Sequence, residues 1–348
     1  AEPVVLQIAP NDHPPFGDIL ETYRQALASI GAGVETLVLS EPTAQPIPGC
    51  RYLGLADLAK VSAAGRQLKQ AVTGKPRLAL CHRYRSYRVL RASGLKIPRV
   101  VTIAHEFGFF KRLQRRLEQR LFARHVIFAG VSPAVQAELG EVVPDPLCLP
   151  NAIDVELARA RCLDRTASLA ELGVPESDAL TIGLVGRLVE KKSPELAVEA
   201  LKELLAQQED VRLLVIGDGP LRGALEARSK DLPVTFCGFV PDARRLLAAL
   251  DLLLLTSKEV EAFGMVALEA MCAGVPVVSG PMPGPQFVLG GTGFYYNQRQ
   301  PEQIAAAVVQ VKAEKDNGVL SERLGRAAER AEREFSLAAL AARLRMLI

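Results

Sequence analysis

Tryptophan is absent from this chain of 348 residues, and aromatic residues account for only 5% of it. Proteins that bind polysaccharide or single-stranded nucleic acid often stack rings on exposed aromatic side chains, so the composition argues against such a platform. No apolar run approaches the ~18 residues that a membrane-spanning helix needs, and no signal peptide is visible. We therefore expect a cytoplasmic protein that does not span a membrane.

Motifs for common cofactors and metals are also missing. The dinucleotide fingerprint GxGxxG does not occur, because its nearest match, residues 217–223, has the third glycine one place late. The sequence contains no Walker A motif, no Asp-x-Asp pair and no recognised nucleic-acid-binding module. The six cysteines are scattered without a CxxC motif and are expected to be reduced thiols. We expect no metal, no cofactor and no nucleic-acid partner.

Strand-like and helix-like segments alternate along the whole chain, the pattern of parallel sheets with helical crossovers. Strands are predicted at 4–9, 34–39, 77–81, 99–104, 126–131, 181–186, 211–216, 233–237, 251–255 and 275–278. Helices are predicted at 17–30, 56–72, 84–93, 110–124, 133–139, 194–206, 220–228, 242–249, 264–273, 302–313 and 319–333. The length and the 49% apolar content suffice for two cores. We expect an α/β protein with two doubly wound Rossmann-like domains facing a cleft.

The first domain is predicted at residues 1–160 and the second at 161–335. Residues 336–348 are predicted as one more helix, because leucines recur there at helical spacing. These are Leu337, Leu340, Leu344 and Leu347.

The net charge of +3 hides an uneven distribution. Residues 1–150 contain 19 Lys and Arg against 12 Asp and Glu, whereas the remainder contains 23 against 27. Residues 81–125 alone contain 12 basic and two acidic residues. Within them the predicted helix 110–124 has one leucine face, Leu113, Leu117 and Leu121. The ordinary interpretation of this basic region is a solvated helix face. Nucleic acid or an acidic acceptor could also bind to it. We expect a docking surface for an anionic membrane or a phosphorylated lipid acceptor.

Two glutamates eight residues apart, Glu261 and Glu269, flank a predicted helix start that follows the strand at 251–255. The free N–H groups of the helix start would favour an anion. Those groups belong to Phe263, Gly264, Met265 and Val266. Acidic residues beside an anion-binding helix start predict a ligand with both phosphates and hydroxyls.

A basic loop at 186–193 supplies charge for such a ligand. It follows a predicted strand and precedes a helix that Pro194 can begin. Arg187 offers a bidentate fork and Lys192 a point charge for a diphosphate, and Gly186 lets the backbone approach closely. The alternative is a solvated basic loop.

Four segments, in this order and spacing, resemble the retaining glycosyltransferases of the GT-B fold, specifically glycosyltransferase family 4. They are GRLVEKKS (186–193), VIGDGP (215–220), CGFVPD (237–242) and EAFGMVALEAMCAGVPVV (261–278). The resemblance is specific over about residues 145–335 and weaker before them. It implies that the first domain binds the acceptor, that the second binds a nucleotide-diphosphate sugar, and that the last helix packs back on the first domain.

The resemblance also implies roles for individual residues. Glu269 would accept hydrogen bonds from the ribose, and Glu261 would face the donor sugar near the reacting carbon. The loop with Phe239 and Val240 would hold the nucleobase through its backbone. Glu259 is a rival for Glu261, because the usual Ser-x-x-Glu spacing is one residue longer here.

Further expectations concern the first domain and one proline-rich segment. His105 follows the strand 99–104, where family members often have a histidine against the donor sugar; acid–base, hydrogen-bonding and structural roles all remain open. Gly17 stands where the family has a Gly-Gly pair that contacts the donor. The proline-rich residues 280–287 resemble a stiff version of a loop that holds sugar hydroxyls.

The residues together with the family resemblance imply a metal-independent retaining hexosyltransferase, with catalytic residues Glu261, His105, Arg187 and Lys192. UDP-sugars are the favoured donors, with GDP-mannose and ADP-sugars behind them. The expected acceptor is a saccharide or glycolipid, such as lipopolysaccharide core or another cell-envelope glycan, at the inner face of the membrane. The alternatives are an enzyme with a soluble or sugar-phosphate acceptor and a non-catalytic nucleotide-sugar-binding module that docks on membranes.

Overall fold

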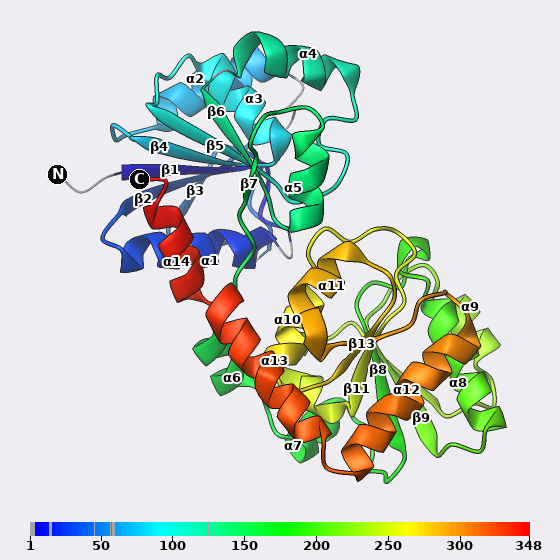
Figure 1. Cartoon of the computed structure of the whole chain (residues 1–348). Coiled ribbons are helices and arrows are strands. Elements are labelled where there is room, and N and C mark those ends of the chain that lie inside the picture. The colour runs from blue at the N-terminus through cyan, green and yellow to red at the C-terminus, as the bar shows by residue number, and fades with distance from the viewer. Residues whose placement is uncertain (1–3, 14–15, 45, 56, 58–59, 124) are drawn as a thin grey trace. The chain divides into compact units, whose positions relative to one another are not determined.

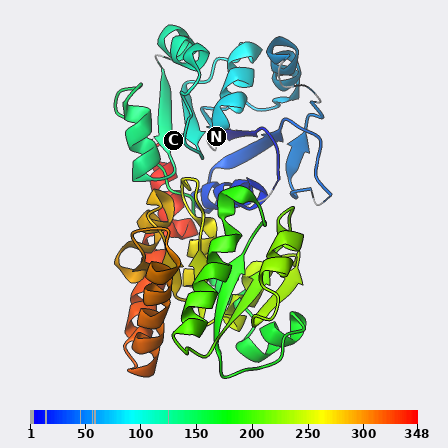
Figure 2. The same ribbon diagram turned by 90° about the vertical axis from the view of Figure 1, so that its right-hand side faces the viewer.

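The computed structural model describes residues 4–13, 16–44, 46–55, 57, 60–123 and 125–348, and Figures 1 and 2 show the chain in two views. The chain divides into two compact units. Unit 1 combines the residues up to Asp154 with Phe335–Ile348, and unit 2 is Val155–Glu334.

Unit 1 is built on a seven-stranded parallel sheet in the order β3-β2-β1-β4-β5-β6-β7. The strands are β1 (Val4–Ala9), β2 (Gly33–Val38), β3 (Cys50–Tyr52), β4 (Leu78–His82), β5 (Arg99–Ala104), β6 (Val126–Gly130) and β7 (Leu147–Cys148). Helices α1 (Phe16–Ser29) and α14 (Leu337–Arg345) lie on one face, and α2 (Val61–Ala71) and α3 (Arg83–Ser93) lie on the other (Figure 1). Helices α4 (Leu113–Phe122) and α5 (Pro133–Gly140) complete the unit.

Unit 2 has a six-stranded parallel sheet in the order β10-β9-β8-β11-β12-β13. The strands are β8 (Leu180–Val185), β9 (Val211–Ile216), β10 (Val234–Gly238), β11 (Leu252–Leu255), β12 (Val277–Ser279) and β13 (Phe294–Tyr295). The helices are α6 (Val155–Arg161), α7 (Arg165–Glu171), α8 (Pro194–Ala206), α9 (Arg222–Arg228), α10 (Met265–Cys272), α11 (Pro283–Leu289), α12 (Pro301–Asp316) and α13 (Leu320–Phe335), with 3-10 turns η1 (Glu190–Lys192), η2 (Ala243–Ala249) and η3 (Gly290–Thr292). Helices α8, α9 and α12 lie on one side of this sheet, and α10 and α11 lie on the other (Figure 1).

The central strands explain why both sheets are parallel and covered on both faces. Every residue of β4 in unit 1 and of β9 and β11 in unit 2 is buried, and β11 consists of four consecutive leucines. Fully buried, mostly apolar strands of this kind are typical of parallel sheets with helices on both sides. The predicted α/β class with two Rossmann-like sheets is therefore confirmed.

The strand order reverses once in each sheet. In unit 1 the reversal lies between β1 and β4, and in unit 2 it lies between β8 and β11. Ligands of open α/β sheets bind outside the carboxyl ends of the strands at such reversals. Each unit therefore has one position at which its fold favours a site.

The last helix, α14, belongs to unit 1 through specific contacts. Ser336 caps the helix by accepting a hydrogen bond from the N–H of Ala339. Near the end of the chain, Arg99 donates to the carbonyl of Leu347 at 2.7 Å. The leucine face of α14 packs on α1 (Figure 1), and Leu340 and Leu344 are fully buried.

Several elements differ from the sequence prediction. The predicted helix 242–249 is the 3-10 turn η2, and the short elements β3, β7, β13, α6, α7 and α11 were not predicted. Two or three residues of edge strand carry no detectable periodicity, because pairing with a neighbour defines them. Residues 56, 58 and 59 of the predicted helix 56–72, and residue 124 of the helix 110–124, lie outside the described residues. Among the residues that are described, no helix is long and apolar enough to cross a membrane.

Candidate functional site

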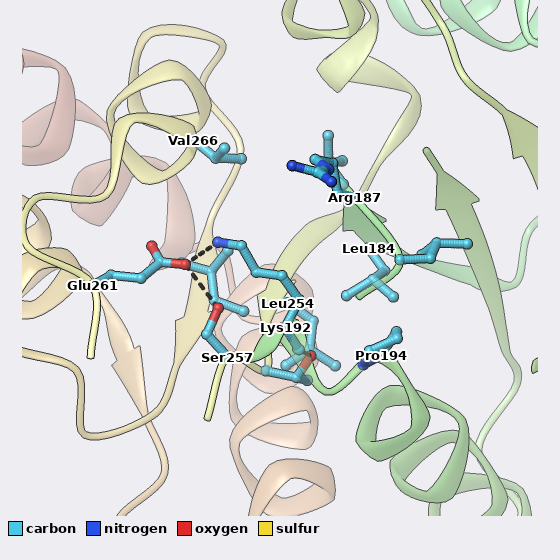
Figure 3. A pocket seen from close by; sticks show the side chains of 13 residues that line it. Leu184, Arg187, Lys192, Pro194, Leu254, Ser257, Glu261 and Val266 are labelled. Carbon is cyan, nitrogen blue, oxygen red and sulfur yellow. Dashed lines mark hydrogen bonds and ion pairs between the residues drawn. The ribbon is translucent and has the colours of Figure 1, made fainter. Parts of the chain in front are cut away.

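A pocket in unit 2 opens at the carboxyl ends of β8 and β11, the two strands at the reversal. It holds about 410 Å³ of empty space that continues into solvent. Its lining comes from β8 and its following loop, the start of α8, β11 and its following loop, and α10 (Figure 3). The residues are Leu184, Val185, Gly186, Arg187, Leu188, Lys192, Pro194, Leu254, Leu255, Thr256, Ser257, Glu261 and Val266.

Glu261 is the centre of a polar cluster in this pocket. Lys192 forms an ion pair with its Oε1 atom, and the hydroxyl of Ser257 donates to the same oxygen at 2.7 Å (Figure 3). The side chains of Lys192 and Glu261 are 38% and 22% exposed, so a ligand can reach both. The cluster therefore offers positive charge and a hydrogen-bond acceptor within one small space.

Arg187 adds a second cation. It follows Gly186 at the end of β8, is exposed, and forms no ion pair within the part of the chain that the structure describes. Gly186 has a φ of 132°, a conformation that side chains disfavour. A Cβ on neighbouring Gly217 would lie 1.9 Å from the carbonyl oxygen of Gly186, so two glycines are needed where these loops touch.

Backbone contacts fix the loop that carries Lys192. The hydroxyl of Thr256 donates to the carbonyl of Lys192 at 2.9 Å, and the N–H of Lys258 donates to the carbonyl of Lys191 at 2.9 Å. The guanidinium of Arg299 donates to the carbonyl of Thr256 at 2.7 Å. These bonds join the basic loop after β8 to the loop after β11, so the charges are held before a ligand arrives.

The start of α10 provides a helix N-terminus near this cluster. Gly264, with a φ of 99°, is its N-cap, and no side chain caps the helix. Its first turn contains no acidic residue. The N-terminal N–H groups and the helix dipole therefore favour an anion here.

The proline-rich segment 280–287 is a loop only as far as Met282. Pro283 is the first residue of α11, because the ring fixes a helical φ and the missing N–H is not needed there. Within α11, the N–H of Gly284 donates to the carbonyl of Glu261 at 3.0 Å, and a Cβ at Gly284 would lie 2.4 Å from that oxygen. The segment therefore supports the backbone of Glu261.

The structure brings five predicted residues into the pocket lining: Gly186, Arg187, Lys192, Glu261 and Val266. The other predicted residues of unit 2 do not line it. Phe263 is 4% exposed and packs near Phe287, Gly264 and Met265 lie at the start of α10, and Glu269 lies one turn beyond Val266. Phe239 is 76% exposed in the loop after β10, and Val240 follows it.

Two comparisons refine the predicted set. Glu259 is exposed and does not line the pocket, so the geometry favours Glu261 over its rival. Ser257 and Arg299 were not predicted as site residues. The spacing from Ser257 to Glu261 is visible in the sequence, whereas no local signal identifies Arg299, which comes from beyond β13.

His105 and Gly17 belong to unit 1. Gly17 lies in the first turn of α1. His105 follows β5, and its Nε2 lies 3.0 Å from the Nδ1 of His82. Burial, together with neighbouring His82 and Arg83, lowers the pKa of His105 well below 6.5. The imidazole is therefore neutral near pH 7.

Comparisons with known proteins relate part of unit 2 to a described family. Residues 179–314 match the family described as Glycosyl transferases group 1. A 2-deoxystreptamine glucosyltransferase of Streptomyces kanamyceticus is 36% identical over 149 residues, which cover 41% of this chain and 38% of that protein. The lipopolysaccharide core biosynthesis glycosyltransferase LpsE of Rhizobium meliloti is 34% identical over 177 residues, which cover 49% and 50%. The matched regions thus span half or less of the length of these relatives.

A solved structure extends the likeness to both units. Anabaena Alr3699/HepE, in complex with UDP and glucose, aligns with a TM-score of 0.79 at 18% identity over 99% of both chains. At this identity the likeness shows the fold alone. The chain has the two-sheet α/β fold of the GT-B glycosyltransferases, as its sequence predicted.

Proposed function

We propose that this chain is a glycosyltransferase that moves a sugar from a nucleotide-diphosphate sugar to a hydroxyl of a saccharide or glycolipid. The observation that carries the proposal is the cluster of Lys192 and Glu261 beside Arg187. It lies at the strand reversal of unit 2 and inside the segment that matches the glycosyltransferase family. Two cations suit a diphosphate, and a carboxylate suits sugar hydroxyls.

The main chemical demand is the departure of the nucleoside diphosphate. As the bond from the anomeric carbon to the diphosphate oxygen breaks, negative charge grows on the leaving group. In this proposal, Arg187, Lys192 and the N-terminus of α10 stabilise that charge; the first two line the pocket, and the helix start has no side-chain cap. We propose that these groups act in place of a metal ion.

The carboxylates have different tasks in this proposal. Glu261 orients hydroxyls of the donor sugar and stabilises positive charge near the anomeric carbon, while Lys192 and Ser257 hold its orientation. Glu269 accepts hydrogen bonds from the ribose, and the loop with Phe239 and Val240 holds the base. A UDP-sugar donor and retention of anomeric configuration follow the family resemblance.

Nucleotide binding is the first test. Unfolding temperature is measured in EDTA with UDP, GDP, ADP, CMP and NAD. A selective rise with one nucleoside diphosphate identifies the base, because a ligand that binds only the native state stabilises it. If the unfolding temperature rises with NAD alone, or does not rise with any nucleoside diphosphate, the result contradicts the proposal.

Turnover separates an enzyme from a binding module. Release of nucleoside diphosphate from the corresponding sugar donor is followed for Glu261→Gln and for its matched control Glu259→Gln. We expect the first variant to keep nucleotide binding and lose turnover, and the control to keep both. A wild-type protein that binds the donor but never turns it over, with any saccharide, sugar-phosphate or lipid acceptor, supports the binding module instead.

A second proposal concerns the surface of α4. Leu113, Leu117 and Leu121 lie on one face of this helix and are 71%, 50% and 70% exposed. The buried residue of the helix is Glu118, which accepts a hydrogen bond from the hydroxyl of Tyr84 at 2.7 Å. A helix of a globular protein normally buries its apolar face, so this exposed leucine face indicates an interaction surface.

The charges around these leucines indicate which kind of partner this surface binds. Lys111, Arg112, Arg116 and Arg120 are all exposed. Two copies of this face in contact would bring like charges together, whereas anionic headgroups would neutralise them. We propose that α4 lies in the plane of an anionic membrane surface, with its leucines at the acyl boundary.

Vesicle co-sedimentation tests the membrane surface. We expect binding to vesicles that contain phosphatidylglycerol, weaker binding in high salt, and loss of binding in the double variant Leu117→Gln, Leu121→Gln. Leu157→Gln is the control, since Leu157 is 40% exposed in unit 2. Equal binding to neutral and anionic vesicles contradicts the proposal. A concentration-dependent dimer that only the double variant loses assigns the face to a second copy.

A further inference from the structure

The junction of β4 and α3 in unit 1 has no loop. β4 ends at His82, and the next residue, Arg83, is the first residue of α3. Arg83 has a φ of 67°, in the left-handed region that a long side chain rarely adopts. Such backbone strain concentrates at functional sites, and sharp strand-to-helix turns are known to present a functional side chain. This turn lies beside the strand reversal of unit 1.

The guanidinium of Arg83 lacks a counterion among the described residues. Its Cζ lies 4.2 Å from the ring centroid of Phe16, so the aromatic face holds the cation. Its Nε is buried and has no hydrogen-bond acceptor in the described part of the chain. A buried donor without a partner is costly, so a ligand that accepts from Arg83 would remove that cost.

A chain of hydrogen bonds fixes the protons of two histidines nearby. The Nε2 group of Gln7 donates to the carbonyl of Leu20 at 3.2 Å. A carbonyl only accepts, so this bond fixes which end of the amide is nitrogen. The same nitrogen lies 3.2 Å from the Nε2 of His82, which must therefore accept, and the proton of His82 sits on Nδ1. Thr36 completes the chain by donating to the Oε1 of Gln7.

The chain ends at His105. The Nδ1–H of His82 donates to the Nε2 of His105, so the proton of His105 must also sit on Nδ1. That Nδ1 is buried and has no acceptor among the described residues. Burial lowers the pKa of His82 to about 3, so both rings are neutral and the proton positions hold across the physiological range. His105 therefore presents a neutral N–H donor at Nδ1.

The two residues with unsatisfied donors contact the same aromatic ring. The ring of Phe16, which carries Arg83 on its face, lies 4.9 Å from the ring of His105. β4 and β5, which precede Arg83 and His105, are neighbours in the sheet. The N-terminus of α3 lies at the same place, without a side-chain cap or an acidic residue in its first turn. Three groups that favour negative oxygen thus meet at one edge of the sheet.

We propose that Arg83, the Nδ1–H of His105 and the N-terminus of α3 form an oxyanion site for a phosphate or carboxylate group of the acceptor substrate. Gln7 and His82 are positioning residues, because they direct the donor of His105 toward that group. The assignment of the oxyanion to an acceptor depends on the proposed glycosyl transfer. The binding of an oxyanion does not.

Inorganic phosphate and nitrogen-15 NMR of labelled histidine provide the test. We expect the spectrum to show His82 and His105 protonated on Nδ1, and phosphate to shift the Nδ1–H signal of His105. The titration is repeated with saturating UDP. Phosphate binding that survives UDP assigns the site to the acceptor, whereas displacement by UDP assigns it to the donor diphosphate and overturns the acceptor assignment.

Two variants examine the parts separately. Arg83→Gly removes the cation and accommodates the positive φ, so we expect an unchanged or raised unfolding temperature and phosphate affinity lowered about 10- to 100-fold. Arg85→Ala, which removes an exposed arginine of the same helix, should change neither. Gln7→Glu should move the histidine protons to Nε2, because a carboxylate can only accept, and should weaken phosphate binding without moving UDP affinity.

The proposal fails if His105 carries its proton on Nε2 in the wild-type protein, or if Arg83→Gly binds phosphate as tightly as wild type. These readouts do not depend on catalysis. A protein that transfers no sugar but binds phosphate here would contradict the proposed function and leave this site standing. A protein that transfers sugar but does not bind phosphate here would support the proposed function and contradict the oxyanion site.

Discussion

The two units share one architecture but differ in whether the polar groups at the strand reversal already have partners. In unit 2 the carboxylate at the strand reversal is already paired, since Lys192 and Ser257 both contact Glu261. In unit 1 the corresponding edge leaves the donors of Arg83 and His105 without acceptors among the described residues. The first arrangement is complete before a ligand binds, and the second becomes complete only with a ligand.

This difference indicates how each unit contributes to binding. Positioned charges can stabilise a developing transition state without reorganisation, which suits the departure of a diphosphate. Unsatisfied buried donors instead favour any partner that supplies an acceptor, which suits selection of one substrate over another. We therefore expect substitutions in unit 2 to reduce turnover and substitutions at Arg83 to change substrate affinity.

The largest expected effect lies in the paired cluster. Lys192→Ala removes a cation from the pocket, and loss of one preorganised electrostatic contact should lower kcat by roughly 10²- to 10³-fold. Lys191→Ala is the matched control, because this neighbouring lysine is exposed and does not line the pocket. Steady-state kinetics with the donor identified by nucleotide binding measure both. Equal losses of kcat in the two variants would show that turnover depends on the overall positive charge of the loop and not on the position of Lys192.

The same contrast explains what the sequence could and could not predict. Gly186, Arg187, Lys192 and Glu261 line one pocket, and the sequence could group them because each lies in a short segment with turn signals that follows an apolar strand. Gln7 and His82 are 75 residues apart, and neither has a local signal for their contact. The positive φ of Arg83 was equally hidden, because arginine does not favour that conformation. Long-range contacts therefore limited the prediction of unit 1.

The next effect concerns stability, and it tests the close contact of loops in unit 2. A Cβ at Gly217 would lie 1.9 Å from the carbonyl oxygen of Gly186, and the φ of Gly217 is 148°. Gly217→Ala should therefore lower the free energy of unfolding by about 2–4 kcal/mol, through overpacking and backbone strain. Urea unfolding measures the change.

Gly223→Ala is the control for the Gly217 variant. Gly223 lies inside α9, is exposed, and a Cβ there would meet nothing within 4 Å. Because alanine favours a helix more than glycine does, this variant should gain about 0.5–1 kcal/mol. If both variants lose stability, close packing is not the reason that glycine occupies position 217.

The smallest effect distinguishes unit 1 by its response to acid. Burial lowers the pKa of His82 to about 3 and that of His105 well below 6.5, whereas unfolding returns both to their ordinary range. Between those values the unfolded chain binds more protons than the native chain. The stability that each neutral ring contributes is therefore fully present above pH 6.5 and is lost as the pH falls toward the folded pKa, by up to ~1.4 kcal/mol per pH unit per histidine.

Urea unfolding of the wild type and of His82→Gln between pH 6.5 and 4 measures this contribution. Carboxylates titrate in both proteins, so the difference between the two slopes belongs to the histidines. We expect the slope of the free energy of unfolding against pH to be smaller in His82→Gln than in the wild type, by about 1.4 kcal/mol per pH unit. The control His125→Gln replaces an exposed histidine of the same unit and should keep the wild-type slope. Identical slopes for all three proteins would mean that His82 is not held neutral by burial. The proton positions inferred for His82 and His105 would then lose their basis, and with them the contrast between a unit whose site is complete and a unit whose site awaits a ligand.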